Sequence, residues 1–249
     1  MDFAGLDLLD RESTYVWPCL EETMLGDWTV RFGGGVYGRS NSVQPRGSAG
    51  IDVEDAISRC EELYRSRGLP PMFRIPRIGD WRELDQRLEE RGYEESELTD
   101  VRLSALSALS AGSFEPGVTL APAYDEAWMA GYFLGSHRGA GRERSVYQLL
   151  ERVPLPRRFA GISREGRTVA VGLGVIADST LWLFGMATEE AYRGQGMATA
   201  IVNSLFAWAA AEGCQRSALQ VLATNEAASR VYDRFGFETI YSYHYRRLV

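Results

Sequence analysis

The chain has 249 residues, of which 45% are hydrophobic and 24% are charged, a composition typical of a soluble globular protein. Its net charge of −7 excludes a general nucleic-acid binder. Residues 1–115 hold 13 arginines and 22 acidic residues, whereas residues 116–249 hold 14 and 12. We therefore expect the site of any anionic ligand in the second half.

The residue types that are missing or isolated exclude several chemistries. The sequence has no lysine, which excludes Schiff-base chemistry and a P-loop. Cys19, Cys60 and Cys214 form no CxxC pair, and His137 and His244 have no metal-ligand spacing, so we predict no metal site. The acidic start does not resemble a signal peptide, and no apolar run reaches the roughly 18–20 residues that span a bilayer. We predict a cytoplasmic protein with reduced thiols that binds neither nucleic acid nor membrane.

The first half has a weak pattern of alternating elements. We predict a hairpin of strands at 27–32 and 34–43 around Gly33–Gly35, a helix at 53–67, a strand at 72–75 and a helix at 81–91.

The second half is clearer and predicts an α/β fold with a mixed sheet. We predict helices at 123–134 and 145–153, strands at 159–162, 168–177 and 181–187, a helix at 197–212, a strand at 217–222, a helix at 225–235 and a strand at 237–245. A strand, a glycine loop, a helix and a strand in that order indicate a βαβ crossover. Asn225 is placed to cap the last helix.

The two halves resemble each other. The segment LEERGYEES at Leu88 matches YDRFGFETI at Tyr232 when shifted by 144 residues, with helix, glycine and aromatic superposed. This similarity indicates two lobes of related shape, with residues 114–118 as the linker. The alternative is that any two helix–glycine–strand units look alike.

The stretch EEAYRGQGMATAI, residues 189–201, suggests a binding site for a diphosphate. Two glycines, Gly194 and Gly196, allow close approach to a backbone that continues into a helix N-terminus. The third glycine of a dinucleotide fingerprint is missing, because Thr199 stands there. In isolation the stretch also fits an ordinary strand-to-helix turn.

The surrounding motifs resemble the GNAT superfamily of acyl-CoA-dependent N-acetyltransferases over about residues 121–249. Arg193, Gly196 and Ala198 match its Arg/Gln-x-x-Gly-x-Gly/Ala motif, and Asn225 and Tyr232 match a second motif of an asparagine followed by a tyrosine seven residues later. The position three residues before the arginine, often proline, is Glu190, a minor departure. The whole chain is similar to tandem-GNAT proteins.

The resemblance implies acetyl-CoA as cosubstrate and assigns residues to it. The diphosphate would contact the loop and helix start, formed by Arg193, Gly194, Gln195, Gly196, Met197, Ala198 and Thr199. The pantetheine arm would lie along Met186, Ala187 and Thr188, with Asn225 and Ser229 as further coenzyme contacts.

The resemblance also implies that Tyr232 is the general acid that protonates the leaving thiolate, and Glu189 or Glu190 could act as the base. Core packing is the alternative role for Tyr232, helix capping for Asn225, and a solvated loop for the two glutamates. Alternation puts Tyr241, Tyr243 and Tyr245 on one strand face and His244 on the other, where sheet packing is the leading interpretation.

The first lobe lacks the corresponding residues. Leu88 stands where Tyr232 would be, and Asp52 stands where phosphate would lie. We therefore predict a degenerate GNAT-like lobe at 1–113, a linker at 114–118, and a complete catalytic GNAT domain at 119–249. The predicted function is acetyl transfer to the primary amine of a small molecule by a monomer or homodimer. A non-catalytic acetyl-CoA-binding regulatory module and an acetyltransferase for protein or peptide amines are the alternatives.

Overall fold

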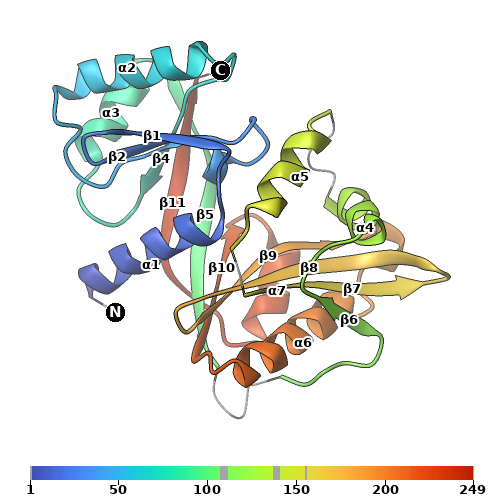
Figure 1. Ribbon diagram of the computed structural model, residues 1–249. Coiled ribbons are helices and arrows are strands. Elements are labelled where there is room, and N and C mark those ends of the chain that lie inside the picture. Colours follow the sequence, from blue (N-terminus) through green and yellow to red (C-terminus); the bar gives the residue numbers. More distant parts are fainter. Residues whose placement is uncertain (1, 107–111, 137–140, 155, 249) are drawn as a thin grey trace.

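The computed structural model describes residues 2–106, 112–136, 141–154 and 156–248 (Figure 1). The first half contains α1 (Phe3–Val16), β1 (Glu21–Leu25), β2 (Trp28–Phe32), η1 (Gly38–Ser40), β3 (Val43–Gln44), α2 (Val53–Arg65), β4 (Met72–Pro76), α3 (Arg82–Glu90) and β5 (Tyr93–Ala105). The second half contains β6 (Val118–Ala121), α4 (Glu126–Ser136), α5 (Glu143–Glu151), β7 (Arg157–Arg164), β8 (Arg167–Ala177), β9 (Thr180–Thr188), η2 (Glu190–Tyr192), α6 (Met197–Ala211), β10 (Arg216–Leu222), α7 (Glu226–Asp233) and β11 (Glu238–Leu248).

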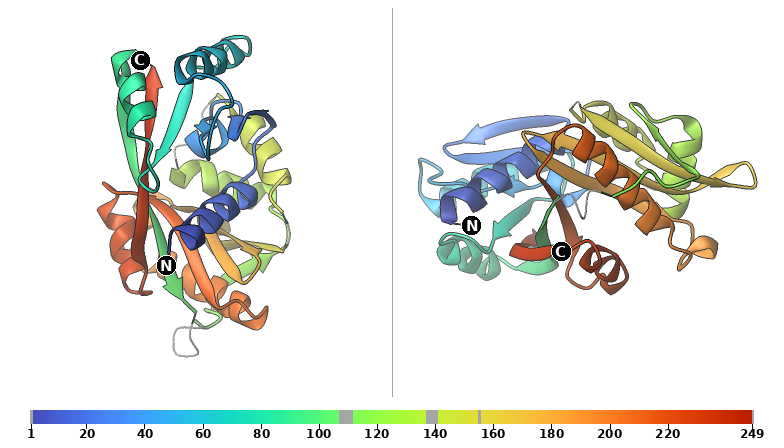
Figure 2. Two further views of the ribbon diagram at one scale, coloured as in Figure 1. Left: turned by 90° about the vertical axis from the view of Figure 1, so that its left-hand side faces the viewer. Right: turned by 90° about the horizontal axis from the view of Figure 1, so that it is seen from below.

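All of these strands belong to one mixed sheet. Its order is β1-β2-β3-β4-β11-β5-β10-β9-β8-β7-β6. The C-terminal strand β11 lies between β4 and β5, and β5 in turn lies between β11 and β10. Figure 2 shows these two long strands, β5 in green and β11 in red, running side by side where the halves meet. Each half therefore places its last strand next to the other half.

The order of elements in the first half recurs in the second. From β1 to β5 the order is three strands, a helix, a strand, a helix and a strand. The same order recurs from β7 to β11. Val53 and Met197, the first residues of α2 and α6, are 144 residues apart, as are Arg82 and Glu226, the first residues of α3 and α7. The spacing is the one found in the sequence comparison.

Helices cover both faces of the second-half strands. Helices α1, α4 and α5 share one buried cluster with Val171, Phe184 and Ala218 of the sheet. Leu183 and Leu219, which point to the opposite face, form a second cluster with α6 and α7. In Figure 1, α4 and α5 lie above strands β7 to β9 and α6 lies below them. The sheet thus separates a face covered by α6 from a face covered partly by the first half.

Most second-half elements lie where the sequence predicts them, and the errors are concentrated in the first half. The predicted hairpin is wrong: the tight turn is at Gly26, with φ of +55°, and it joins β1 to β2. Gly33 and Gly35 instead donate backbone hydrogen bonds to the Asn41 side chain, which fixes a loop rather than a strand pair. The sequence interpretation also lacked α1, β1, β5 and β6, and β6 begins at Val118, inside the predicted linker.

Two of the sequence exclusions can be compared with the structure. No helix among the described residues combines the length and apolar character needed to cross a bilayer. Cys19, Cys60 and Cys214 are all free thiols. His137 lies outside the described residues.

Candidate active site

The parallel strands β9 and β10 pair over only part of their length. Pairing runs from their first residues to Leu183 and Leu219, and it stops there. Gly185 has a φ of +59° and lies in a bulge that shifts the register of β9 against β8. Residues 184–188 therefore present an unpaired backbone edge toward β10, at the carboxyl ends of both strands.

Met186, Ala187 and Thr188 occupy this unpaired segment, and packing on both faces fixes it. The Met186 side chain packs with Ile201 of α6 over Gly172, where a methyl group would lie only 2.5 Å from the methionine sulfur. On the other face, a methyl group at Gly135 of α4 would lie 2.9 Å from the Thr188 nitrogen. The backbone edge is held in place before any ligand arrives.

The glycine loop leads from β9 into the N-terminus of α6. Gly194 and Gly196 have φ values of +75° and +81°, which side-chain-bearing residues rarely adopt. A methyl group on either glycine would meet no atom within 4 Å, so the backbone borders open space. Within the described part of the chain, the N–H groups of residues 194–199 have no hydrogen-bond partner. An oriented set of free donors at a helix N-terminus suits an anion, and it fits the diphosphate of coenzyme A.

Two polar side chains stabilise the loop from within. The Arg193 Nε donates to the Thr188 carbonyl at 3.2 Å, and the Gln195 amide donates to the Ala191 carbonyl at 3.4 Å. Both side chains are exposed. Arg193 thus braces the loop against the end of β9 and adds a positive charge beside the free N–H groups. Met197 is buried beneath the loop, whereas Ala198 and Thr199 are partly exposed at the start of α6.

The two candidate bases occupy different environments. Glu189 forms a two-point ion pair with Arg167 at the start of β8, with N–O distances of 2.6 and 3.0 Å. Its backbone N–H donates to the Val169 carbonyl, so this residue ties the loop to the neighbouring strand. Glu190 is exposed at the start of the 3-10 helix η2. The geometry gives Glu189 a structural task and leaves the Glu190 carboxylate in solvent.

Tyr232 lies on α7 and is 8% exposed. Its ring packs among the side chains beneath α6, with its centroid 5.7 Å from that of Phe237. Its hydroxyl makes no hydrogen bond to another described residue. Burial raises the pKa of Tyr232 to about 12, and the charge of Arg102 opposes this increase only in part. The phenol is therefore protonated at neutral pH and retains an unused donor.

Asn225 caps α7, as its position in the sequence predicts. Its side-chain oxygen accepts a hydrogen bond from the Ala228 N–H at 3.1 Å, and the residue is exposed just beyond the end of β10. Ser229 follows one turn later and is partly exposed. The capping role is confirmed, and the side-chain amide group of Asn225 remains available to a ligand at the same edge of the sheet.

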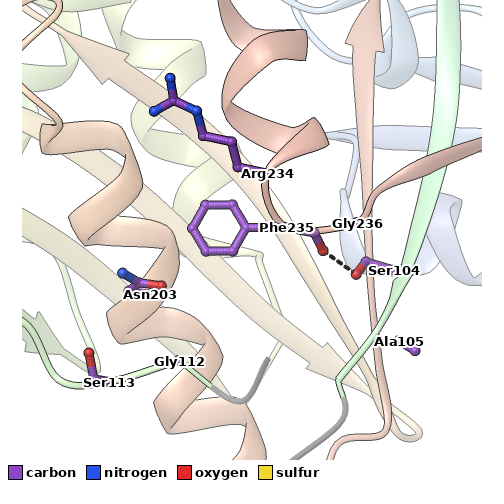
Figure 3. Close-up of a pocket in the computed structure, with 8 residues that line it drawn as sticks. All are labelled: Ser104, Ala105, Gly112, Ser113, Asn203, Arg234, Phe235 and Gly236. Carbon is purple, nitrogen blue, oxygen red and sulfur yellow. Dashed lines mark hydrogen bonds between the residues drawn. The ribbon is translucent and has the colours of Figure 1, made fainter. Parts of the chain in front are cut away.

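The topology brings the predicted coenzyme contacts to one end of the second half, whereas Tyr232 lies in the last turn of α7. The end of β9, the glycine loop, the start of α6 and the start of α7 all follow the carboxyl ends of β9 and β10. The cavity of about 610 Å³ in Figure 3 lies elsewhere, between α6 and the end of α7, where the Ser104 hydroxyl donates to the Phe235 carbonyl. None of the predicted site residues lines that cavity.

Sequence reasoning missed three features of this region. Gly185 within an apolar strand was the available signal for the bulge, because an isolated glycine in a strand commonly marks one. Nothing in the sequence indicated that Arg167 would pair with Glu189, or that Tyr243 of β11 would donate to Gln220 of β10 at 2.8 Å. Among the described residues, no group of His, Cys, Asp and Glu side chains is arranged to hold a metal ion.

Comparisons with known proteins agree with this geometry. A protein-family model described as "Probable histone acetyltransferase Rv0428c C-terminal" matches residues 7–247. The "Uncharacterized N-acetyltransferase YobR" of Bacillus subtilis (strain 168) is 28% identical over 243 residues, which cover 96% of each chain. The solved GCN5-related N-acetyltransferase from Kribbella flavida has a TM-score of 0.69 at 17% identity, covering 98% of this chain and 94% of that one. A "Tandem GNAT protein from the clavulanic acid biosynthesis pathway" has a TM-score of 0.61 at 12% identity, covering 88% and 77%.

The solved structures show a shared fold at these identities, whereas the family model spans nearly the whole chain. The same family is indicated by the GNAT motifs, by the separated strands and by the family match. The chain belongs to the family of the Rv0428c C-terminal region and is a GNAT-type N-acetyltransferase, an acyltransferase of a class that uses acetyl-CoA as its cosubstrate.

Proposed function

We propose that this enzyme transfers an acetyl group from acetyl-CoA to the primary amine of a small molecule. The observation that carries the proposal is the unpaired edge of β9, which opens beside a helix N-terminus with free N–H groups. An extended pantetheine arm can add to such an edge as a strand would, while the diphosphate is bound by the N–H groups of residues 194–199.

Acetyl-CoA would supply the activated acetyl thioester, and coenzyme A would leave as the thiolate. We propose that a backbone N–H group at the unpaired edge of β9 donates to the thioester oxygen as negative charge develops there, which typically contributes about 10²–10³ in rate. Tyr232 would donate a hydrogen bond to the departing sulfur. Its protonated state at neutral pH suits it to that task, and a hydrogen bond lowers the barrier even before the proton transfers completely.

The amine must lose a proton before or during its attack. Glu190 is the better placed of the two predicted carboxylates, because Glu189 is occupied by Arg167. We propose that Glu190 accepts the proton through solvent. In this proposal the ion pair of Glu189 positions the loop rather than taking part in proton transfer.

We further propose that residues 1–113 and 119–249 are two GNAT-like lobes in tandem that exchange their last strands. The repeated element order, the 144-residue spacing and the reciprocal placement of β5 and β11 support this interpretation. The first lobe has no coenzyme site in this proposal. The Asp52 carboxylate caps α2 by accepting from the Glu54 N–H at 2.9 Å, so this helix N-terminus already has an anion. Leu88 is fully buried where the acid would stand.

A peptide or protein amine is the second candidate acceptor, because the matching family is described as a probable histone acetyltransferase. Thiol release from acetyl-CoA, measured with a panel of small amines and with lysine-containing and free N-terminal peptides, separates the possibilities. We expect turnover with at least one small amine. Turnover on peptides alone would show that the acceptor is a peptide or protein amine. Coenzyme binding without turnover on any amine would support a regulatory module and contradict the proposal.

A further inference from the structure

An arginine of the first half lies beside the point where β9 and β10 separate. The Arg39 guanidinium, in η1, is 5.5 Å from the ring centroids of both Trp17 and Phe184. Phe184 is the residue of β9 directly before the Gly185 bulge, and its ring points to the face opposite α6. Arg39 therefore lies on the sheet face from which an acceptor can approach a thioester whose diphosphate is held on the α6 side.

This guanidinium has no anionic partner among the residues that the structure describes. Within the described part of the chain it forms no ion pair and donates no hydrogen bond, although it is partly buried. The more deeply buried Arg74 and Arg246 both pair with aspartates, at 2.6 and 2.7 Å. A guanidinium that is partly removed from water is costly unless it is paired, so an unpaired one beside a reaction centre suggests a missing anion.

The backbone of Arg39 is fixed as a binding residue requires. Its carbonyl accepts hydrogen bonds from Arg31 Nη1 at 2.8 Å and from Gln44 Nε2 at 3.0 Å, and both of these side chains are buried. The preceding residue, Gly38, packs so closely on Tyr245 that a methyl group there would lie 2.7 Å from its ring. The guanidinium is thus presented from a rigid turn, with flat aromatic surfaces beside it.

We propose that Arg39 binds a carboxylate on the acceptor, so that the enzyme acetylates small amines that also carry a carboxylate, such as amino acids. This inference rests on the proposed function and specifies its substrate class. The planar guanidinium can donate two parallel hydrogen bonds to a carboxylate while the amine reaches the separated strands. It also gives the first half a direct role, because that half supplies a residue that selects the acceptor.

The test compares matched acceptors, each a carboxylated amine beside its neutral carboxamide, for example β-alanine and β-alaninamide, across a range of chain lengths. We expect the wild-type enzyme to prefer the carboxylated members. In Arg39→Gln, kcat/KM for carboxylated amines should fall by about 10- to 100-fold, mainly through KM, while the value for carboxamides changes little. Arg39→Lys should restore part of the preference, because it keeps the charge and loses the planar fork.

Arg158→Gln is the matched control, because the Arg158 guanidinium also lies over an aromatic ring, 5.0 Å from Trp208, but on the α6 face. It should leave the preference unchanged, and acetyl-CoA affinity should be the same in all variants. Equal loss for both members of each pair would show a merely structural role and overturn the inference. Turnover of neutral amines without any carboxylate preference would overturn it while leaving the proposed function standing. Turnover on no amine would overturn both.

Discussion

Replacing Tyr232 with phenylalanine isolates the hydroxyl group that is expected to assist departure of the thiolate. The side chain is buried by ring contacts, and its hydroxyl has no hydrogen-bond partner among the described residues, so the substitution should leave packing intact. General acid catalysis contributes about 10²–10⁴ in rate. Because burial raises the pKa of Tyr232 from 10.0 to about 12, the phenol is a weaker acid than usual, and we expect a loss near the lower limit. A loss of about 10² corresponds to about 3 kcal/mol of transition-state stabilisation.

The assay is thiol release at saturating acetyl-CoA and amine, with coenzyme affinity measured separately by calorimetry. We expect kcat to fall about 100-fold while the dissociation constant of acetyl-CoA and the free energy of unfolding stay nearly constant. Tyr192→Phe is the control, because it removes a hydroxyl from a tyrosine at the same end of the sheet, whose ring is 5.6 Å from Arg167. Unchanged turnover in Tyr232→Phe, or an equal loss in both variants, would refute the assignment of Tyr232 as the acid.

Three further predictions follow from the loop, from the α7 cap and from a buried ion cluster. Gly196→Glu should weaken acetyl-CoA binding by at least tenfold in calorimetry, because a side chain at φ of +81° is strained and its charge repels the diphosphate. An affinity equal to wild type would contradict diphosphate binding by the glycine loop. Asn225→Ala should cost about 1 kcal/mol of stability through loss of the α7 cap, measured by urea unfolding, and no change would show that the cap is dispensable. Burial acts to raise the pKa of Asp10, but Arg74 and Arg46 outweigh it and hold the pKa at about 2, below the ordinary 3.8. The stabilisation from Asp10, about 2 kcal/mol, should therefore be complete above about pH 4 and be lost as the pH falls toward 2. Asp10→Asn should remove that acid dependence. It should also lower the free energy of unfolding by about 3–5 kcal/mol at neutral pH, because it leaves Arg74 unpaired.

The sequence predicted the second half well because its signals are local. The apolar alternation of β8 and β9, the glycines that flank α6 and the asparagine that caps α7 act over a few residues, and the structure confirms these elements within a few residues. The buried positions Ile201, Leu205 and Trp208 follow directly from the helical period of α6.

The parts that the sequence could not predict depend on contacts between distant segments. Strand β5 carries several charged residues that resemble an exposed segment, yet it pairs with β10 and β11, which are distant in the sequence. The pairing of Glu189 with Arg167 and the position of Arg39 over Phe184 likewise arise only from the tertiary fold. The motif could therefore indicate the coenzyme but not the residues that surround the acceptor.

A crystal structure of the enzyme with acetyl-CoA is the most direct measurement of the central claim. We predict diphosphate oxygens within hydrogen-bond distance of backbone N–H groups in residues 194–199, the pantetheine arm along residues 186–188, and the sulfur within reach of the Tyr232 hydroxyl. A coenzyme bound in residues 1–113, or a sulfur that lies beyond hydrogen-bond distance of that hydroxyl, would contradict the account.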